Sequence, residues 1–140
     1  MCSSDLKASI YAAIDSLLRS LNCPLADVRT LYIAGAFGNR LDVGRCVTVG
    51  LLPDMPLERM KFIGNGSIGG AKLALLDRRR FEEVQALRER ITYQELMVDA
   101  SYMEKFTSAC FLPHTDLSRF PSVEARLAAS SAGGKEGRTP

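Results

Sequence analysis

The chain has 140 residues, of which 46% are hydrophobic and 24% are charged, and its formal net charge is +2. This length and composition predict one globular domain with a hydrophobic core. The small net charge gives no support for nucleic acid or a membrane surface as a partner. No apolar run approaches the roughly 20 residues that cross a bilayer, and the start, MCSSDLKAS, lacks the basic and apolar regions of a signal peptide.

Four cysteines are scattered through the sequence and form no C-x-x-C pair, and His114 is the single histidine. This pattern argues against a zinc site or an iron–sulfur cluster that is held by this chain alone. Unpaired thiols are typical of a reducing compartment, so we expect a cytoplasmic protein.

In the first half of the chain, one strand is expected, with a helix before it and a helix after it in the sequence. Residues 4–22 predict a helix whose apolar stripe recurs at three- and four-residue steps. The stripe consists of Ile10, Ala13, Ile14, Leu17, Leu18 and Leu21. Residues 24–28 indicate one helical turn, and residues 30–34 predict a strand whose near-continuous apolar character favours cover on both faces. Asp42 is the expected N-cap of a short helix, residues 43–49, that ends at Gly50.

A second strand is predicted at residues 60–64, after a helical turn at residues 56–58. It runs into a glycine cluster at residues 64–70, and an apolar helix is expected at residues 71–76. After a break at residues 77–80, the pattern predicts an amphipathic helix over residues 81–91. Its inward side chains are expected to be Phe81, Val84, Leu87 and Ile91.

The last third of the chain is less regular. Residues 93–98 predict a strand, and residues 100–111 predict a helix that Asp99 caps and Pro113 ends. Residues 122–129 are expected to form a weak helix. The final residues, SSAGGKEGRTP, are small and polar and are expected to be disordered.

The chain is organised around two glycine turns that each follow a strand. The first is LYIAGAFGN, residues 31–39, and the second is the cluster at residues 64–70. Open α/β sheets bind ligands beyond the carboxyl ends of such strands, although a plain strand-to-helix connection also explains a glycine turn. Phe37 inside the first turn either covers a ligand ring or fills the local core. Gly69 and Gly70 each cost a helix roughly 1 kcal/mol relative to alanine, so we expect a close backbone or ligand to compensate.

The second cluster also contains the pattern G-x-G-x-x-G, formed by Gly64, Gly66 and Gly69. Its position between a strand and a helix is the context of a dinucleotide-binding fingerprint. The acidic residue that should follow about 20 positions later is weakly placed, because Glu82 and Glu83 lie in a predicted helix. A small NAD-type binder is therefore an alternative function.

Few residues are suited to catalysis or metal binding. His114 lies in a proline-flanked loop and is interpreted as a surface histidine rather than a general base. Asp42 and Asp54 can act as N-caps or hold magnesium through water, and the N-cap is favoured for Asp42. Cys46 and Cys110 lie on predicted helix faces and are expected in the core. The sequence therefore assigns no catalytic residue and no metal ligand.

The ordered segments AGAFGN, GLLPD and FIGNGS, within residues 7–113, resemble the C-terminal part of the reductive activators of corrinoid proteins. These activators are ATP-dependent iron–sulfur proteins, and their ATPase fold belongs to the superfamily of acetate kinase, sugar kinases, heat-shock chaperones and actin. The resemblance implies an α/β fold that forms part of one lobe of an actin-like, ribonuclease H-like ATPase, with a short sheet packed with helices. It assigns residues 1–121 to this lobe and residues 122–140 to a weak helix and tail.

By this resemblance, the turn after the first strand is similar to the adenosine motif, which lies against the base and ribose of ATP. Ala36 stands where the wider superfamily often has a second glycine, so its methyl group narrows the approach to the nucleotide. The ATP contacts that the resemblance implies are Gly35, Ala36, Phe37, Gly38, Asn39, Asn65, Gly66 and Ser67.

The resemblance also implies a role. An intact activator uses ATP to reduce cob(II)alamin to cob(I)alamin on a corrinoid protein of a methyltransferase system. The cysteines of the iron–sulfur domain and the phosphate-binding loops are missing from this sequence, so we expect a fragment or truncated member that is inactive alone.

Two further points stay open at the level of sequence. A non-catalytic α/β binding or assembly module is the alternative function, and a homodimer is one option for the assembly. If one lobe is missing, an apolar face should be exposed.

Overall fold

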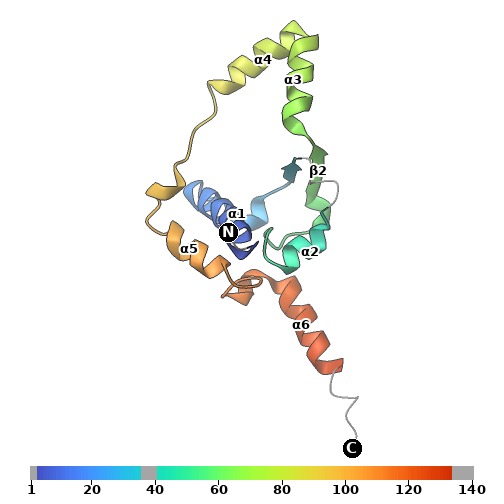
Figure 1. Cartoon of the computed structure of the whole chain (residues 1–140), viewed down its shortest axis with the longest axis vertical. Helices are drawn as coiled ribbons and strands as arrows, with labels where there is room; N and C mark the ends of the chain where they lie inside the picture. Colours follow the sequence, from blue (N-terminus) through green and yellow to red (C-terminus); the bar gives the residue numbers. More distant parts are fainter. Residues whose placement is uncertain (1–2, 36–40, 134–140) are drawn as a thin grey trace, which may run out of the picture.

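The computed structural model describes residues 3–35 and 41–133 and is a mixed α/β structure (Figure 1). Within these residues, six α-helices and two strands follow in chain order: α1 (Ser3–Ser20), β1 (Leu31–Ala34), α2 (Val43–Thr48), β2 (Met60–Gly64), α3 (Gly66–Leu76), α4 (Arg78–Arg88), α5 (Tyr102–Ala109) and α6 (Pro121–Gly133). Short 3₁₀ helices join them: η1 (Leu25–Asp27), η3 (Leu57–Arg59), η4 (Leu96–Val98) and η5 (Leu117–Arg119). The α/β class is confirmed, and β2 has the predicted bounds.

The two strands form a parallel sheet, with α2 in the connection between them. Leu31 and Ile33 of β1 pack against the core, whereas Tyr32 keeps 61% of its surface exposed. The prediction that both faces of β1 are covered is therefore wrong for this chain. Its physical reason is that the described helices supply cover for one face of the sheet only.

The core lies between α1, α2, α5 and the start of α6. Its buried members are Ala8, Tyr11, Cys46, Val47, Leu52, Met55, Met60, Ala109, Phe120 and Val123. Cys46 is thus buried as predicted, and Cys110 packs against this cluster. The predicted stripe of α1 is not its buried face, because Ile10, Leu17 and Leu21 are exposed while the neighbouring positions turn inward.

Two polar clusters fix α1 to α5, which pack against each other. The buried Lys7 ammonium donates hydrogen bonds to the carbonyl oxygens of Ala109, Phe111 and Pro113, where the chain leaves α5. Because a lysine near a helix C-terminus satisfies carbonyls that have no partner in the helix, Lys7 ties α1 to this end of α5.

The second cluster joins the middle of α1 to the start of α5. Asp99 accepts hydrogen bonds from the Ser16 hydroxyl at 3.0 Å and from the Lys105 ammonium at 2.6 Å. Its other oxygen accepts from the backbone N–H of Ser101 at 2.9 Å. These bonds, with that of Lys105 first, hold the pKa of Asp99 well below its usual range. Ser101, not Asp99, is the N-cap residue of α5, so that prediction is wrong.

Residues close to its two ends determine where the short helix α2 begins and ends. Asp42 is its N-cap, as predicted, because the carboxylate accepts a hydrogen bond from Arg45 N at 3.0 Å. The helix ends just before Gly50, which has a φ of +73°. A side chain at Gly50 would overlap the backbone of Pro113, so this glycine also allows the close approach of two distant loops.

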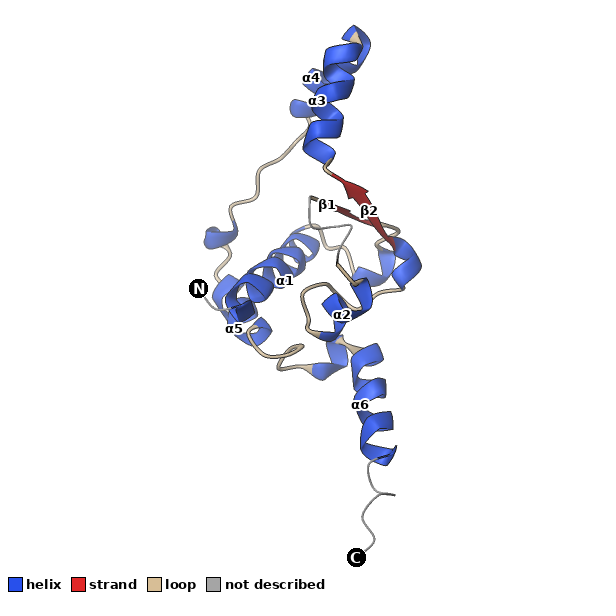
Figure 2. Cartoon of the chain, turned by 45° about the vertical axis from the view of Figure 1, so that its right-hand side comes forward, coloured by secondary structure: helices blue, strands red, loops and turns tan. Residues whose placement is uncertain are grey.

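Helices α3 and α4 form a hairpin that stands away from the rest of the chain (Figure 2). The connection between the two helices is shorter than the predicted break at residues 77–80, because α4 starts at Arg78. Asp77 is its N-cap residue, and its carboxylate accepts a hydrogen bond from Arg79 N at 2.9 Å. Neither helix contains a buried residue. The predicted inward side chains, Phe81, Val84, Leu87 and Ile91, are all exposed. That prediction is wrong because, among the described elements, α4 packs mainly against α3, and this contact leaves the four side chains largely exposed.

The end of the chain departs from the prediction in two places. Residues 93–98 do not form a strand, and the 3₁₀ turn η4 occupies their second half. Helix α6 runs to Gly133, so residues 130–133 are helical rather than disordered. The remaining residues of the predicted tail, 134–140, lie outside the described part of the chain.

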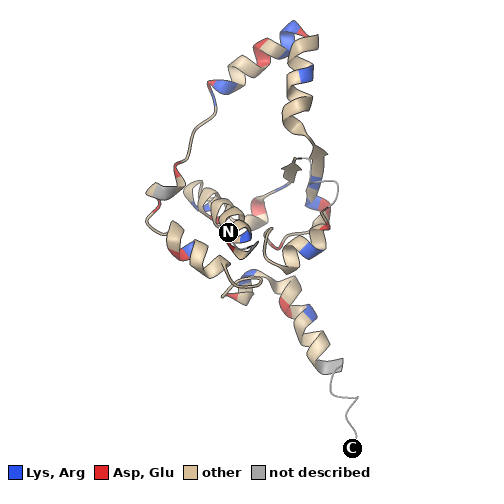
Figure 3. Cartoon of the chain, in the orientation of Figure 1, with Lys and Arg blue, Asp and Glu red and all other residues tan. Residues whose placement is uncertain are grey.

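Charged side chains of both signs are distributed over the elements (Figure 3). No helix in the described ranges is long and apolar enough to cross a membrane. Among the same residues, no group of three or more histidine, cysteine, aspartate or glutamate side chains could hold a metal ion.

Candidate functional site

The candidate site lies where the two parallel strands end. At this edge Gly35 N donates a hydrogen bond to the carbonyl oxygen of Gly64 at 2.7 Å. A register shift after Ile33 sets Ala34 opposite Gly64. The backbone therefore leaves β1 and β2 at the same edge of the sheet. Ligands of α/β sheets bind beyond such carboxyl ends.

Both turns require glycine for conformational reasons. Gly35 has a φ of +133° and Gly64 a φ of +67°, which L side chains rarely adopt. Within the described part of the chain, a Cβ atom at either position would meet no atom within 4 Å, so contacts among these residues do not explain the two glycines. The result is an edge whose surface is backbone, which a ligand can approach closely.

The start of α3 completes this edge. Asn65 is the N-cap residue, and its side-chain oxygen accepts a hydrogen bond from Ile68 N at 3.1 Å. Gly66 lies over the end of β1, since a Cβ atom there would be 3.5 Å from Ala34 Cβ. Ser67 is exposed in the first turn. The first N–H groups of a helix have no partner inside it and carry a partial positive charge, so this turn can hold an anion.

The structure therefore brings four of the predicted site residues to one edge of the sheet, namely Gly35, Asn65, Gly66 and Ser67. The other four, Ala36, Phe37, Gly38 and Asn39, lie outside the described residues. The edge offers backbone N–H groups, an amide and a hydroxyl, which are suited to binding and orienting a ligand rather than to proton transfer.

The three titratable candidates from the sequence, Asp42, Asp54 and His114, have structural partners. Asp42 caps α2, and Asp54 accepts a hydrogen bond from Ser122 N at 2.7 Å, at the start of α6. His114 is not a surface residue, because only 7% of it is exposed. The interpretation of His114 as a surface histidine is wrong because the loop that carries it folds back onto α1, where its ring packs against Tyr11.

The dinucleotide alternative gains no acidic partner from the structure. Gly64, Gly66 and Gly69 do lie between β2 and the body of α3, as a fingerprint requires. However, Glu82 pairs with Arg78 at 3.1 Å and Glu83 pairs with Arg80 at 2.8 Å on the exposed helix α4. Neither glutamate stands at the end of a strand, where a ribose would be recognised.

Residues 3–124 match the family model described as the C-terminal domain of RACo, the ASKHA domain. The chain therefore belongs to the family of RACo C-terminal ASKHA domains. This finding confirms the resemblance to the reductive activators of corrinoid proteins and identifies the described α/β structure as part of an ASKHA fold.

Two relatives agree with this family. The corrinoid activation enzyme RamQ of Eubacterium limosum is 34% identical over 100 residues, which cover 71% of this chain and 17% of RamQ. A solved structure of a reductive activator for a corrinoid, iron–sulfur protein is 41% identical, with a TM-score of 0.82 over 86% of this chain and 19% of that chain. The chain thus spans less than a fifth of the length of either relative.

Proposed function

We propose that this ASKHA domain is the C-terminal nucleotide-binding part of an ATP-dependent reductive activator of a corrinoid protein. The observation that carries the proposal is the edge where both strands end in positive-φ glycines, in a chain of this family. In the proposal, the backbone at Gly35 and Gly64, joined by a hydrogen bond of 2.7 Å, forms the wall against which the adenosine lies, and the first turn of α3 adds N–H groups.

In this proposal the nucleotide contacts are Gly35, Ala36, Phe37, Gly38, Asn39, Asn65, Gly66 and Ser67. The free energy of ATP binding or hydrolysis makes a thermodynamically unfavourable one-electron reduction possible. The electron comes from an iron–sulfur cluster in another domain of the activator and converts cob(II)alamin to cob(I)alamin on a corrinoid protein of a methyltransferase system. The residues of this domain bind and orient the nucleotide. We also propose a reducing, cytoplasmic location, which fits the free thiols of Cys23, Cys46 and Cys110.

Isothermal titration of Mg-ATP into a full-length activator that carries this domain tests the wall. Gly35→Val is expected to weaken ATP binding at least tenfold, because valine does not adopt a φ of +133° and adds bulk at the wall. Circular dichroism of the same samples separates this effect from a loss of fold. Unchanged affinity for ATP in a folded Gly35→Val variant would remove the turn from the nucleotide site.

Two variants of Ser67 test the same site without changing a residue that has a positive φ. Ser67→Glu places a carboxylate in the first turn of α3, where a negative charge stabilises a helix but repels a polyanionic ligand. Ser67→Gln has a similar size without the charge. We expect Ser67→Glu to bind ATP about fivefold more weakly than Ser67→Gln. Equal ATP affinities for this pair contradict the placement of the nucleotide beside α3.

A further inference from the structure

A second site lies away from the strand ends, between α1 and the segment that follows it. It is a pocket of about 330 Å³ whose ten lining residues include none of the proposed nucleotide contacts. This volume is at the lower end of the range for small-molecule pockets, which is about 300–1,000 Å³.

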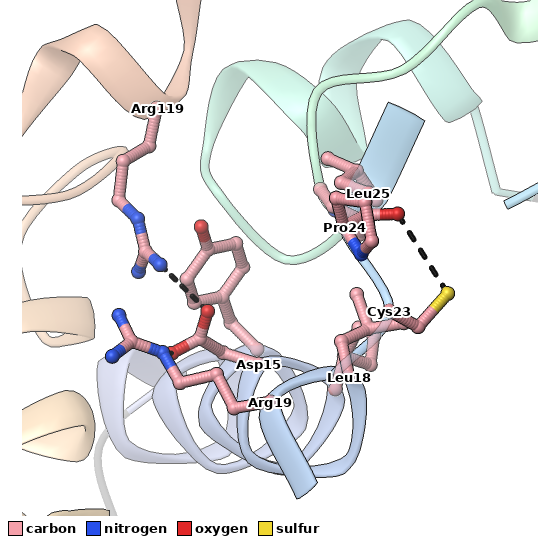
Figure 4. Close-up of a pocket in the computed structure, with 10 residues that line it drawn as sticks. Asp15, Leu18, Arg19, Cys23, Pro24, Leu25 and Arg119 are labelled. Carbon is pink, nitrogen blue, oxygen red and sulfur yellow. Dashed lines mark hydrogen bonds and ion pairs between the residues drawn. The ribbon is translucent and has the colours of Figure 1, made fainter. Parts of the chain in front are cut away.

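The pocket has one charged side and one apolar side (Figure 4). Asp15, Arg19 and Arg119 lie together on one side, and Leu18, Pro24 and Leu25 lie on the other. This division suits an amphipathic ligand, because each part of such a ligand would meet surface of its own kind.

On the charged side, two arginines share one carboxylate. Arg119 Nη2 lies 2.6 Å from Asp15 Oδ1, and Arg19 Nε lies 3.1 Å from Asp15 Oδ2. Both guanidinium groups are charged at any physiological pH, so the three side chains carry a net charge of +1. A guanidinium has five N–H donors. Arg119 donates one of them to Asp15 Oδ1, whereas the contact of Arg19 with Asp15 Oδ2 is an ion pair without a hydrogen bond, so both arginines keep donors for a further anion.

The position of Arg119 is fixed by more than its ion pair. Its guanidinium carbon lies 5.8 Å from the centre of the Tyr11 ring, and the Asp15 side chain beneath it is only 13% exposed. Arg19 is different, since 62% of its side chain is exposed. Arg119 is therefore largely enclosed at the pocket, whereas Arg19, although paired with Asp15, lies mostly in water.

We propose that this pocket binds a small carboxylic acid with an apolar body. The carboxylate pairs with Arg19 and Arg119, because the planar guanidinium group matches a carboxylate in two-point hydrogen bonding. Asp116 also lies near enough to Arg119 to compensate part of its charge, and the small positive charge that remains suits a monoanion better than a phosphate monoester, which carries close to two negative charges. The apolar body lies against Leu18, Pro24 and Leu25. The proposal is independent of the nucleotide site.

Titration of the 140-residue chain with 3-phenylpropionate, followed by backbone ¹H–¹⁵N NMR, tests the pocket. We expect saturable shifts that concentrate at Leu18, Arg19 and Leu25. The neutral analogue 3-phenylpropionamide is expected to bind at least fivefold more weakly, because it keeps the apolar body and lacks the charge. Absence of saturable shifts, or equal binding of acid and amide, would overturn the proposal.

Charge variants test the assignment of the arginines. Arg19→Gln is expected to weaken 3-phenylpropionate binding about fivefold, and its exposed side chain makes loss of fold a minor concern. Arg78→Gln is the matched control, since Arg78 also forms an exposed i,i+4 ion pair, at 3.1 Å, outside the pocket. Asp15→Asn should tighten binding, because the net charge of the cluster rises to +2. Equal affinities for the acid in Arg19→Gln and Arg78→Gln would contradict the proposal.

Discussion

The ring of His114 lies in the aromatic centre of the core. Its centroid is 5.4 Å from that of Tyr11 and 6.3 Å from that of Phe120. Nδ1 accepts a hydrogen bond from Asp116 N at 3.0 Å, which places the proton of the neutral ring on Nε2. Burial is the main cause that lowers the pKa of His114, and the positive charges of Arg119 and Lys7 add to it, whereas Asp116 opposes it.

This environment predicts a pH-dependent stability. The folded-state pKa of His114 lies below the unfolded value of about 6.5, so the unfolded state binds the proton more tightly. The contribution of neutral His114 is fully present above pH ~6.5 and is lost as the pH falls from there toward the folded-state pKa. We therefore expect the free energy of unfolding, measured with urea, to be lower at pH 5.5 than at pH 7.5.

A control variant isolates this residue. His114→Phe keeps an aromatic ring between Tyr11 and Phe120 and loses one hydrogen bond, which costs about 1 kcal/mol at pH 7.5. Because the chain has a single histidine, the change in stability between pH 7.5 and 5.5 should fall to less than about half in this variant. An equal change in both proteins means that His114 is not the group that titrates.

At the scale of elements, the end of α2 depends on one glycine. Gly50 has a positive φ, and a Cβ atom there would overlap the carbonyl oxygen of Pro113. Gly50→Ala combines a left-handed backbone with a backbone clash that no side-chain rotation relieves. We expect it to lower the free energy of unfolding by about 3 kcal/mol or more, measured by urea denaturation.

Gly69→Ala is the matched control for this prediction. A Cβ atom at Gly69 would meet nothing within 4 Å, and the residue has ordinary helical geometry in α3. Its replacement should leave stability unchanged or raise it by up to about 1 kcal/mol. Equal free energies of unfolding for the two alanine variants would show that the close approach of Gly50 to Pro113 does not contribute to stability.

Elements with strong local signals could be predicted from the sequence. The cap at Asp42, the glycine at Gly50 and the strand–glycine–helix order around Gly64 each act within a few residues, and the structure has all three. The bounds of the last helix were wrong, because α3 begins at Gly66 and not at residue 71. The strand predicted at residues 93–98 failed because a strand needs a partner, and the described sheet has only two strands.

The sequence did not predict the pocket beside α1 or the contacts of Lys7, because both depend on residues that are far apart in the sequence. Asp15 and Arg19 form an i,i+4 pair that the sequence could have indicated, but Arg119 is 104 residues from Asp15. Likewise, no local pattern places the Lys7 ammonium on carbonyls that are more than 100 residues away. Such contacts follow only from the way α5 and η5 fold back onto α1.

At the scale of the whole molecule, the apolar surface is divided unequally. The core of α1, α2 and α5 is buried, whereas α3 and α4 have no buried residue and carry exposed side chains such as Leu75, Leu76 and Phe81. This agrees with the expectation that a lobe that lacks its neighbour exposes an apolar face. Since the matched part of this chain covers only 17% and 19% of the two relatives, we infer that further parts of an activator cover this hairpin.

The hairpin should then be the least stable part of the chain. Helices draw most of their stability from the packing of an apolar face, and among the described elements α3 and α4 pack mainly against each other. In hydrogen–deuterium exchange of the 140-residue chain, we expect the amides of α3 and α4 to exchange at least about tenfold faster than those of α1 and α5. Equal protection of the four helices would show that the hairpin is stable without cover. In a full-length activator the same amides should gain protection, because the neighbouring domain would remove Leu75 and Phe81 from water.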